Sequence, residues 1–194
     1  MTGIITSALI GLFAYVNAGA IAPATQSATA IDQPATPTYS VSMTGYNAVP
    51  EQTDGDPHIT ASGAYSNPDI IVARSVDLAD AFPFGTVVEI TQTEANTPGC
   101  GFSMVEKYIG LRVVGDSMHS RKRNQIDILF DNDSTVKVGN REVNPAVALG
   151  VCNKINVRAV GAIDMKNIPR TQNQLRLAVG QLEKATDQNL AVSK

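Results

Sequence analysis

The chain has 194 residues, of which 43% are hydrophobic and 17% are charged, and its formal net charge is −3. This composition is typical of one globular domain with non-globular ends. The weak negative charge excludes a general attraction to nucleic acid, and no glycine-rich phosphate-binding loop is present, which excludes a nucleotide enzyme. We therefore expect no nucleic acid, nucleotide or cofactor among its ligands.

The amino-terminal segment has the features of an export signal. The first 31 residues contain no Asp, Glu, Lys or Arg. The apolar stretch Ile4–Val16 has the length of a signal-peptide core, and Ala18-Gly19-Ala20 supplies small residues that signal peptidase accepts. Residues 1–22 indicate export to the periplasm or cell envelope, either as a cleaved signal peptide or as an uncleaved membrane anchor. Residues 23–38, rich in Ala, Thr, Pro and Gln, predict a flexible linker.

From Tyr39 onward, short runs rich in β-branched residues alternate with clusters of Gly, Pro, Asn and Asp, a pattern typical of strands and turns. Six runs have the length of a strand: Tyr39–Tyr46, Ile70–Arg74, Thr86–Gln92, Leu111–Gly115, Ile126–Phe130 and Ile155–Val160. No long amphipathic segment lies between them, which argues against a parallel βαβ fold. The pattern predicts an all-β domain over residues 39–165, built as a sandwich or a small barrel.

Two short helices are predicted between the strands. Val76–Phe82 ends before a proline, and Pro145–Leu149 has Asn144 as N-cap and Gly150 after its last residue. In the tail, residues 166–194, the apolar positions from Leu175 to Leu182 repeat at helical spacing and predict a C-terminal helix. Its apolar stripe packs on its own domain or, alternatively, binds a partner.

The two cysteines of the chain, Cys100 and Cys152, predict one disulfide in an exported protein. Cys100 falls in the stretch Glu94–Met104, which has the appearance of an inserted hairpin loop. No metal site is expected, because His58 and His119 have no ligand-like spacing to the cysteines. Neither histidine receives a role.

Two aspartates are the candidates for acid chemistry. In the strand around Asp127, alternation places Ile126 and Ile128 on the core face and the carboxylate on the other face. Burial among apolar neighbours in a cleft would raise the pKa of Asp127 toward the range of a general acid. Asp116 follows a predicted strand and would add to this effect if the two strands are neighbours. Alternatively, Asp116 is a turn aspartate that binds local amides.

Seven motifs resemble, in order, those of the three-aspartate (3D) domain. They are Thr44-Gly45-Tyr46-Asn47, Gln52-Thr53-Asp54, Thr60-Ala61-Ser62-Gly63, Val72-Ala73, Pro83-Phe84-Gly85-Thr86, Gly115-Asp116 and Asn124-Gln125-Ile126-Asp127. The match runs from Tyr39 to about Phe130 and continues more loosely to Val160. The family includes membrane-bound lytic transglycosylase A and stationary-phase survival muralytic proteins. The resemblance implies a six-stranded double-psi β-barrel with short helices, in agreement with the six runs.

The resemblance also implies site residues for cutting peptidoglycan. Asp127 would be the general acid and then the base at the glycosidic bond, and Asp116 would support it electrostatically. Tyr46 and Thr60 would line the sugar cleft. Lys122, in the basic run 121–123, would attract the carboxylates of peptidoglycan, although such a run is also typical of a solvated turn.

One departure from the family pattern concerns the first of the three aspartates. Its place before the Pro-Phe-Gly turn is taken by Ser75, and Asp77 follows two residues later. Asp77 would substitute only if this segment is shifted. Otherwise Asp77 is an acidic residue near a helix N-terminus.

Three functions follow as hypotheses. The first is an exported enzyme that cleaves peptidoglycan, a lytic transglycosylase acting on the MurNAc-GlcNAc bond. The second is a non-catalytic barrel that binds glycan or remodels the cell wall, since a fold does not fix a function. The third is a structural envelope protein that holds a partner with its linker and its C-terminal helix.

Overall fold

The computed structural model describes residues 36–53, 56–94 and 97–192, and for some residues after 185 it describes the backbone alone. The predictions of a signal or anchor in residues 1–22 and of a linker up to residue 35 lie outside the described residues. No helix in the described part is long and apolar enough to span a membrane.

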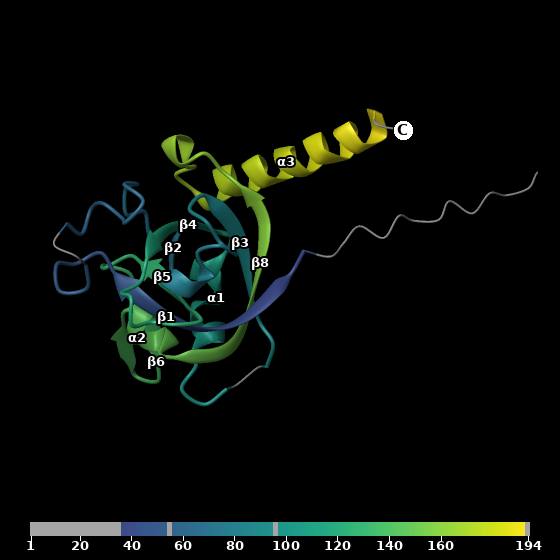
Figure 1. The fold of residues 1–194 in the computed structure, drawn as a ribbon. Coiled ribbons are helices and arrows are strands. Elements are labelled where there is room, and N and C mark those ends of the chain that lie inside the picture. Colours follow the sequence, from purple (N-terminus) through teal and green to yellow (C-terminus); the bar gives the residue numbers. More distant parts are fainter. Residues whose placement is uncertain (1–35, 54–55, 95–96, 193–194) are drawn as a thin grey trace, which may run out of the picture. The chain divides into compact units, whose positions relative to one another are not determined.

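Six strands close into a barrel, which confirms the predicted fold class (Figure 1). They are β1 (Thr38–Asn47), β2 (Ile71–Arg74), β3 (Thr86–Gln92), β4 (Arg112–Ser117), β5 (Gln125–Phe130) and β8 (Cys152–Ala162). Their order around the barrel is β1-β5-β2-β4-β3-β8. β1 pairs with β5, and β2 with β4, in parallel, while the other neighbours are antiparallel. Each of the six predicted runs forms one barrel strand.

The remaining elements are short except for one helix. A two-stranded sheet of β6 (Val136–Val138) and β7 (Arg141–Val143) precedes α2 (Pro145–Leu149). As predicted, α2 is capped by Asn144, whose side chain accepts a hydrogen bond from the backbone N–H of Ala146, and it is followed by Gly150 at φ 62°. Gly150 tolerates this left-handed backbone because it has no Cβ.

Two local predictions are wrong. The helix expected over Val76–Phe82 is only the 3-10 turn η1 (Val76–Leu78), after which the chain continues in turns to Phe82, whose ring is buried and packs edge-on against Tyr39. The hairpin loop expected over Glu94–Met104 ends early, because α1 begins at Phe102 and runs to Ile109. Phe102, Val105 and Ile109 are buried at helical spacing, so the helical pattern was present in the sequence.

The predicted C-terminal helix is α3 (Gln172–Val192), preceded by the 3-10 turn η2 (Met165–Asn167). Leu175 and Val179 are buried and join a cluster with Ile70, Val87 and Val113 on the outside of the barrel. The apolar stripe therefore packs on its own domain, as the first of the two alternatives proposed.

A buried arginine forms hydrogen bonds to barrel strands and to the segments that connect them. Arg112, at the start of β4, is fully buried and donates hydrogen bonds to five backbone carbonyls, those of Pro68, Ile71, Tyr108, Ile109 and Leu129. Burial lowers the pKa of the Arg112 guanidinium to about 10, so the group stays charged near neutral pH. One side chain thus links β2, β5, the end of α1 and the segment before β2.

The predicted disulfide joins Cys100, before α1, to Cys152, the first residue of β8. The bridge ties the long connection between β3 and β4 to a barrel strand. We expect the variant Cys100→Ala/Cys152→Ala to lose ~2–4 kcal/mol of stability, because the unfolded chain regains the freedom that the bridge removes. Thermal unfolding under oxidising conditions measures the loss, and wild type in reductant should reproduce it. Equal melting temperatures for variant and wild type would contradict the prediction.

Candidate active site

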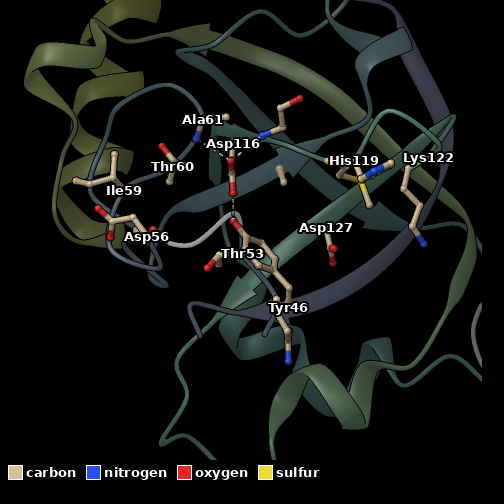
Figure 2. Close-up of a pocket in the computed structure, with 15 residues that line it drawn as sticks. Tyr46, Thr53, Asp56, Ile59, Thr60, Ala61, Asp116, His119, Lys122 and Asp127 are labelled. Atoms are coloured by element: carbon tan, nitrogen blue, oxygen red, sulfur yellow. Dashed lines mark hydrogen bonds between the residues drawn. The ribbon is translucent and has the colours of Figure 1, made fainter. Parts of the chain in front are cut away.

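A pocket of about 460 Å³ lies over the ends of β1, β2, β4 and β5. It is lined by all five predicted site residues: Tyr46, Thr60, Asp116, Lys122 and Asp127. In Figure 2, Asp56, Ile59 and Thr60 form one side of the pocket, His119 and Lys122 form the other, and Asp116 lies with Tyr46 between them. The structure therefore brings together residues that are far apart in the sequence.

Strand register explains why these side chains share one face. Thr44 pairs with Asp127 across β1 and β5, and Ala73 of β2 pairs with both Asp127 and Asp116. Residues two apart on a strand point to the same side, so Tyr46 follows Thr44 onto the pocket face. The glycine between them faces inward, where a Cβ on Gly45 would lie 2.7 Å from the ring of Phe130. The Thr-Gly-Tyr motif thus fits a strand that is crowded on its inner face.

Asp127 has the electrostatics of a general acid. Burial raises the pKa of its carboxyl group to about 6, above the usual value of 3.8. A hydrogen bond from the Thr44 hydroxyl, 2.8 Å from Oδ1, and the charge of Lys122 lower this pKa, and the charge of Asp116 raises it. The burial effect is the largest, so near neutral pH Asp127 exchanges a proton readily.

Asp116 is held in place by three donors. Oδ2 accepts a hydrogen bond from the Tyr46 hydroxyl at 2.7 Å, and Oδ1 accepts from the backbone N–H groups of Ala61 and Ser117 at 2.9 and 2.8 Å. Burial and the charge of Asp116 raise the pKa of Tyr46, so its hydroxyl stays protonated and keeps donating. Asp116 is a fixed acceptor that faces the pocket. It lies in β4 rather than in a turn, and of its two amide donors only Ser117 is local, so its alternative interpretation as a turn aspartate is only partly correct.

The two aspartates do not lie on neighbouring strands. β4 and β5 each pair with β2, and Ala73, only 3% exposed, stands between Asp116 and Asp127. Two strand spacings separate their Cα atoms by roughly 10 Å. The charge of Asp116 accordingly has the smallest effect on the pKa of Asp127, and burial, rather than a proton shared with Asp116, raises this pKa.

Thr60 and Lys122 reach the pocket in different ways. Thr60 is 6% exposed, and its hydroxyl donates to the backbone carbonyl of Ala64 and bonds Ser62, so it shapes the wall rather than offering a free hydroxyl. Lys122 is exposed and contacts no carboxylate in the described part of the chain. Its ammonium group therefore stays available to an anionic ligand.

Neither Ser75 nor Asp77 lines the pocket. The Ser75 side chain is buried, and its hydroxyl accepts a hydrogen bond from the backbone N–H of Gln125. Oδ2 of Asp77 accepts from the backbone N–H of Asn124, which has a φ of 47°. Asp77 therefore does not take the site position that the resemblance assigns to the first aspartate. It stands in the first turn of η1, as its alternative interpretation held, and it holds the segment that leads into β5.

Sequence reasoning missed four residues of this site. Asp56 and His119 line the pocket, and Gln125 binds Thr44, whose hydroxyl in turn binds Asp127. Thr44 and Gln125 belong to the motifs quoted for the resemblance, and strand alternation from Asp127 and Tyr46 would have placed both on the pocket face. Asp56 sits in a loop with no periodic signal, so only the folded chain shows its position.

A comparison of the sequence with protein-family models and with curated proteins finds no match. Membership of the three-aspartate domain family therefore stays a prediction, and any function proposed for the chain has to rest on the site itself.

The raised pKa of Asp127 has a consequence for stability. Between about pH 4 and pH 6 the folded chain keeps a proton that the unfolded chain has lost, so the carboxyl group costs stability progressively as pH rises. We expect Asp127→Asn to be more stable than wild type by ~2 kcal/mol at pH 8, with almost no difference at pH 4. Urea unfolding at the two pH values measures this. A variant that is less stable at pH 8 would contradict the prediction.

Proposed function

We propose that this protein is an exported enzyme that cleaves peptidoglycan, a lytic transglycosylase acting on the MurNAc-GlcNAc bond in the periplasm or cell envelope. The observation that carries the proposal is a single half-buried carboxyl group, Asp127, whose pKa of about 6 suits proton exchange and which lines a pocket of about 460 Å³. The disulfide between Cys100 and Cys152 supports the export.

One acid is sufficient for this chemistry. Asp127 donates its proton to the glycosidic oxygen as the bond from that oxygen to the anomeric carbon breaks. The 6-hydroxyl of the same sugar attacks the anomeric carbon, and Asp127 takes up the hydroxyl proton, which leaves a 1,6-anhydro end and restores the acid. The fixed carboxylate of Asp116 supplies negative charge opposite the positive charge that develops on the sugar ring.

A transglycosylase is favoured over a hydrolase because a hydrolase needs a second carboxylate as nucleophile or water-activating base. Both oxygens of Asp116 are occupied by donors from Tyr46, Ala61 and Ser117. Asp56 lines the pocket, but its Oδ1 accepts a hydrogen bond from the backbone N–H of His58 within its own loop. Asp116 is therefore less free to act than Asp127, whereas Asp56 has one engaged oxygen, as Asp127 has, and differs from it in being exposed on a loop.

The second candidate is a non-catalytic barrel that binds glycan. It is favoured by the serine at position 75, where the resemblance expects an aspartate, and by the position of both Ser75 and Asp77 outside the pocket. In that case the pocket would hold a sugar without cutting it.

Product analysis distinguishes these functions. The full chain, purified in oxidising buffer, is incubated with purified peptidoglycan, and the soluble products are identified by mass spectrometry. Muropeptides with 1,6-anhydro ends establish a lytic transglycosylase. Reducing ends establish a hydrolase. Retention on peptidoglycan without any released product establishes the binding barrel.

A further inference from the structure

Two hydrogen bonds in sequence connect Gln125 to Asp127 through Thr44. Nε2 of Gln125 donates to Oγ1 of Thr44 at 2.8 Å, and Oγ1 of Thr44 donates to Oδ1 of Asp127 at 2.8 Å. The three side chains meet because Thr44 pairs with Asp127 across β1 and β5, and because Gln125 precedes Asp127 by two residues on the same face. We name these three residues the Gln-Thr-Asp relay.

The relay has a fixed direction. A threonine hydroxyl carries a single proton, and an amide NH2 group donates but does not accept. With Gln125 donating to Thr44, the hydroxyl proton of Thr44 has to point at Asp127. Oδ1 of Asp127 is thus permanently engaged by a donor, whereas Oδ2 accepts no hydrogen bond from any residue in the described part of the chain.

Thr44 and Gln125 act only through the acid, because neither of them lines the pocket, whereas Asp127 does. Resting on the function proposed above, we propose that Thr44 and Gln125 are positioning residues: they fix the orientation of the Asp127 carboxyl group and reserve Oδ2 as the oxygen that exchanges a proton with the glycan. A carboxyl group held in this way needs no reorientation between its acid and base steps.

Other charged or titratable groups also lie around Asp127, and their effects on its pKa must be distinguished from the effect of the relay. Tyr46 faces the pocket from β1, Asp116 from β4, and His119 and Lys122 from the segment between β4 and β5, whereas β2 contributes the uncharged Ala73. The charge of Lys122 lowers the pKa of Asp127 and that of Asp116 raises it. A substitution at Thr44 leaves all of these groups in place, so a change in the titration of Asp127 reports on the relay.

The test is a titration of the Asp127 carboxyl carbon by NMR in the full chain, for wild type and three variants. Thr44→Val keeps the shape of the side chain and removes the donor to Oδ1, and we expect the pKa of Asp127 to rise by about one unit. Thr44→Ser restores a hydroxyl and should return the pKa close to that of wild type. Gln125→Met frees the Thr44 hydroxyl to rotate and should raise the pKa by a smaller amount. It also provides the test if Thr44→Val does not fold.

Ser42→Ala is the matched control, because Ser42 stands on the same face of β1 but bonds Asn153 instead of Asp127. It should leave the pKa of Asp127 unchanged. The relay is overturned if Thr44→Val titrates like wild type, or if Thr44→Ser shifts the pKa as far as Thr44→Val does.

Activity gives a second readout. Because the protonated acid is the active form, Thr44→Val should move the alkaline limb of the pH profile of glycan release upward by the same amount as the pKa. An unmoved alkaline limb in an active variant would contradict the relay. If the pKa shifts as expected while wild type releases no glycan, the relay stands and the proposed function fails, so the two failures are distinguishable.

Discussion

Asp127→Asn is expected to reduce the rate of muropeptide release by roughly 10²–10⁴-fold, the usual contribution of a positioned general acid. An asparagine has the same shape as the aspartate and still accepts the hydrogen bond from Thr44, but its amide N–H groups are far too weakly acidic to protonate the glycosidic oxygen. Binding to insoluble peptidoglycan should be retained. The measurement is the initial rate of soluble product formation, quantified by mass spectrometry beside a pull-down on the same peptidoglycan.

Asp133→Asn is the matched control for this experiment, because Asp133 is exposed and lies outside the pocket. It makes the same chemical change and should leave the rate unchanged. Full activity of Asp127→Asn would rule out Asp127 as the acid. Because Asp127→Asn is expected to be more stable than wild type above neutral pH, unfolding would not explain a loss of activity.

Arg112→Met is expected to lower the free energy of unfolding by about 4 kcal/mol. Methionine fills a similar volume but leaves five backbone carbonyls without this donor, three of them buried and two part-buried, and each buried unsatisfied group costs ~1–3 kcal/mol before the surroundings relax. The removal of a buried charge offsets a part of that loss. Urea denaturation measures the change, as a midpoint lowered by roughly 2 M at a slope typical of a small domain.

The control for the buried arginine is Arg141→Met on β7, where the side chain is exposed. It should change the stability by less than ~0.5 kcal/mol. If Arg112→Met is as stable as wild type, the desolvation of the guanidinium costs as much as its hydrogen bonds contribute, and the arginine is not what fastens the barrel.

The strands of this protein were predictable because their signal is local. Runs such as Thr86–Gln92 and Ile126–Phe130 alternate or cluster β-branched residues between turn residues, and each forms a strand within one residue of its predicted bounds. The cap of α2 was predictable for the same reason, since Asn144 and Gly150 stand next to the helix that they delimit.

The arrangement of the strands was not predictable from these local signals. Nothing in the sequence around Asp116 or Asp127 indicates that Ala73 lies between them, because that depends on which strands pair in the closed barrel. Alternation within a single strand does predict which side chains point away from the core, so the side of β5 on which Asp127 lies was predicted correctly. The loop that brings Asp56 to the pocket has no periodicity, and its position depends on tertiary contacts alone.

The residues of the site are far apart in the sequence, and this separation affects when the site can form during folding. The hydrogen bond from Thr44 to Asp127 joins residues 83 positions apart, and the one from Tyr46 to Asp116 joins residues 70 positions apart. Closing such long loops is slow, and no short segment of the chain contains both members of either hydrogen bond. The pocket is complete only when β1 has paired with β5, because this pairing brings Thr44 and Tyr46 to the two aspartates. If the chain is the enzyme proposed above, it would therefore have no partial activity before it has folded.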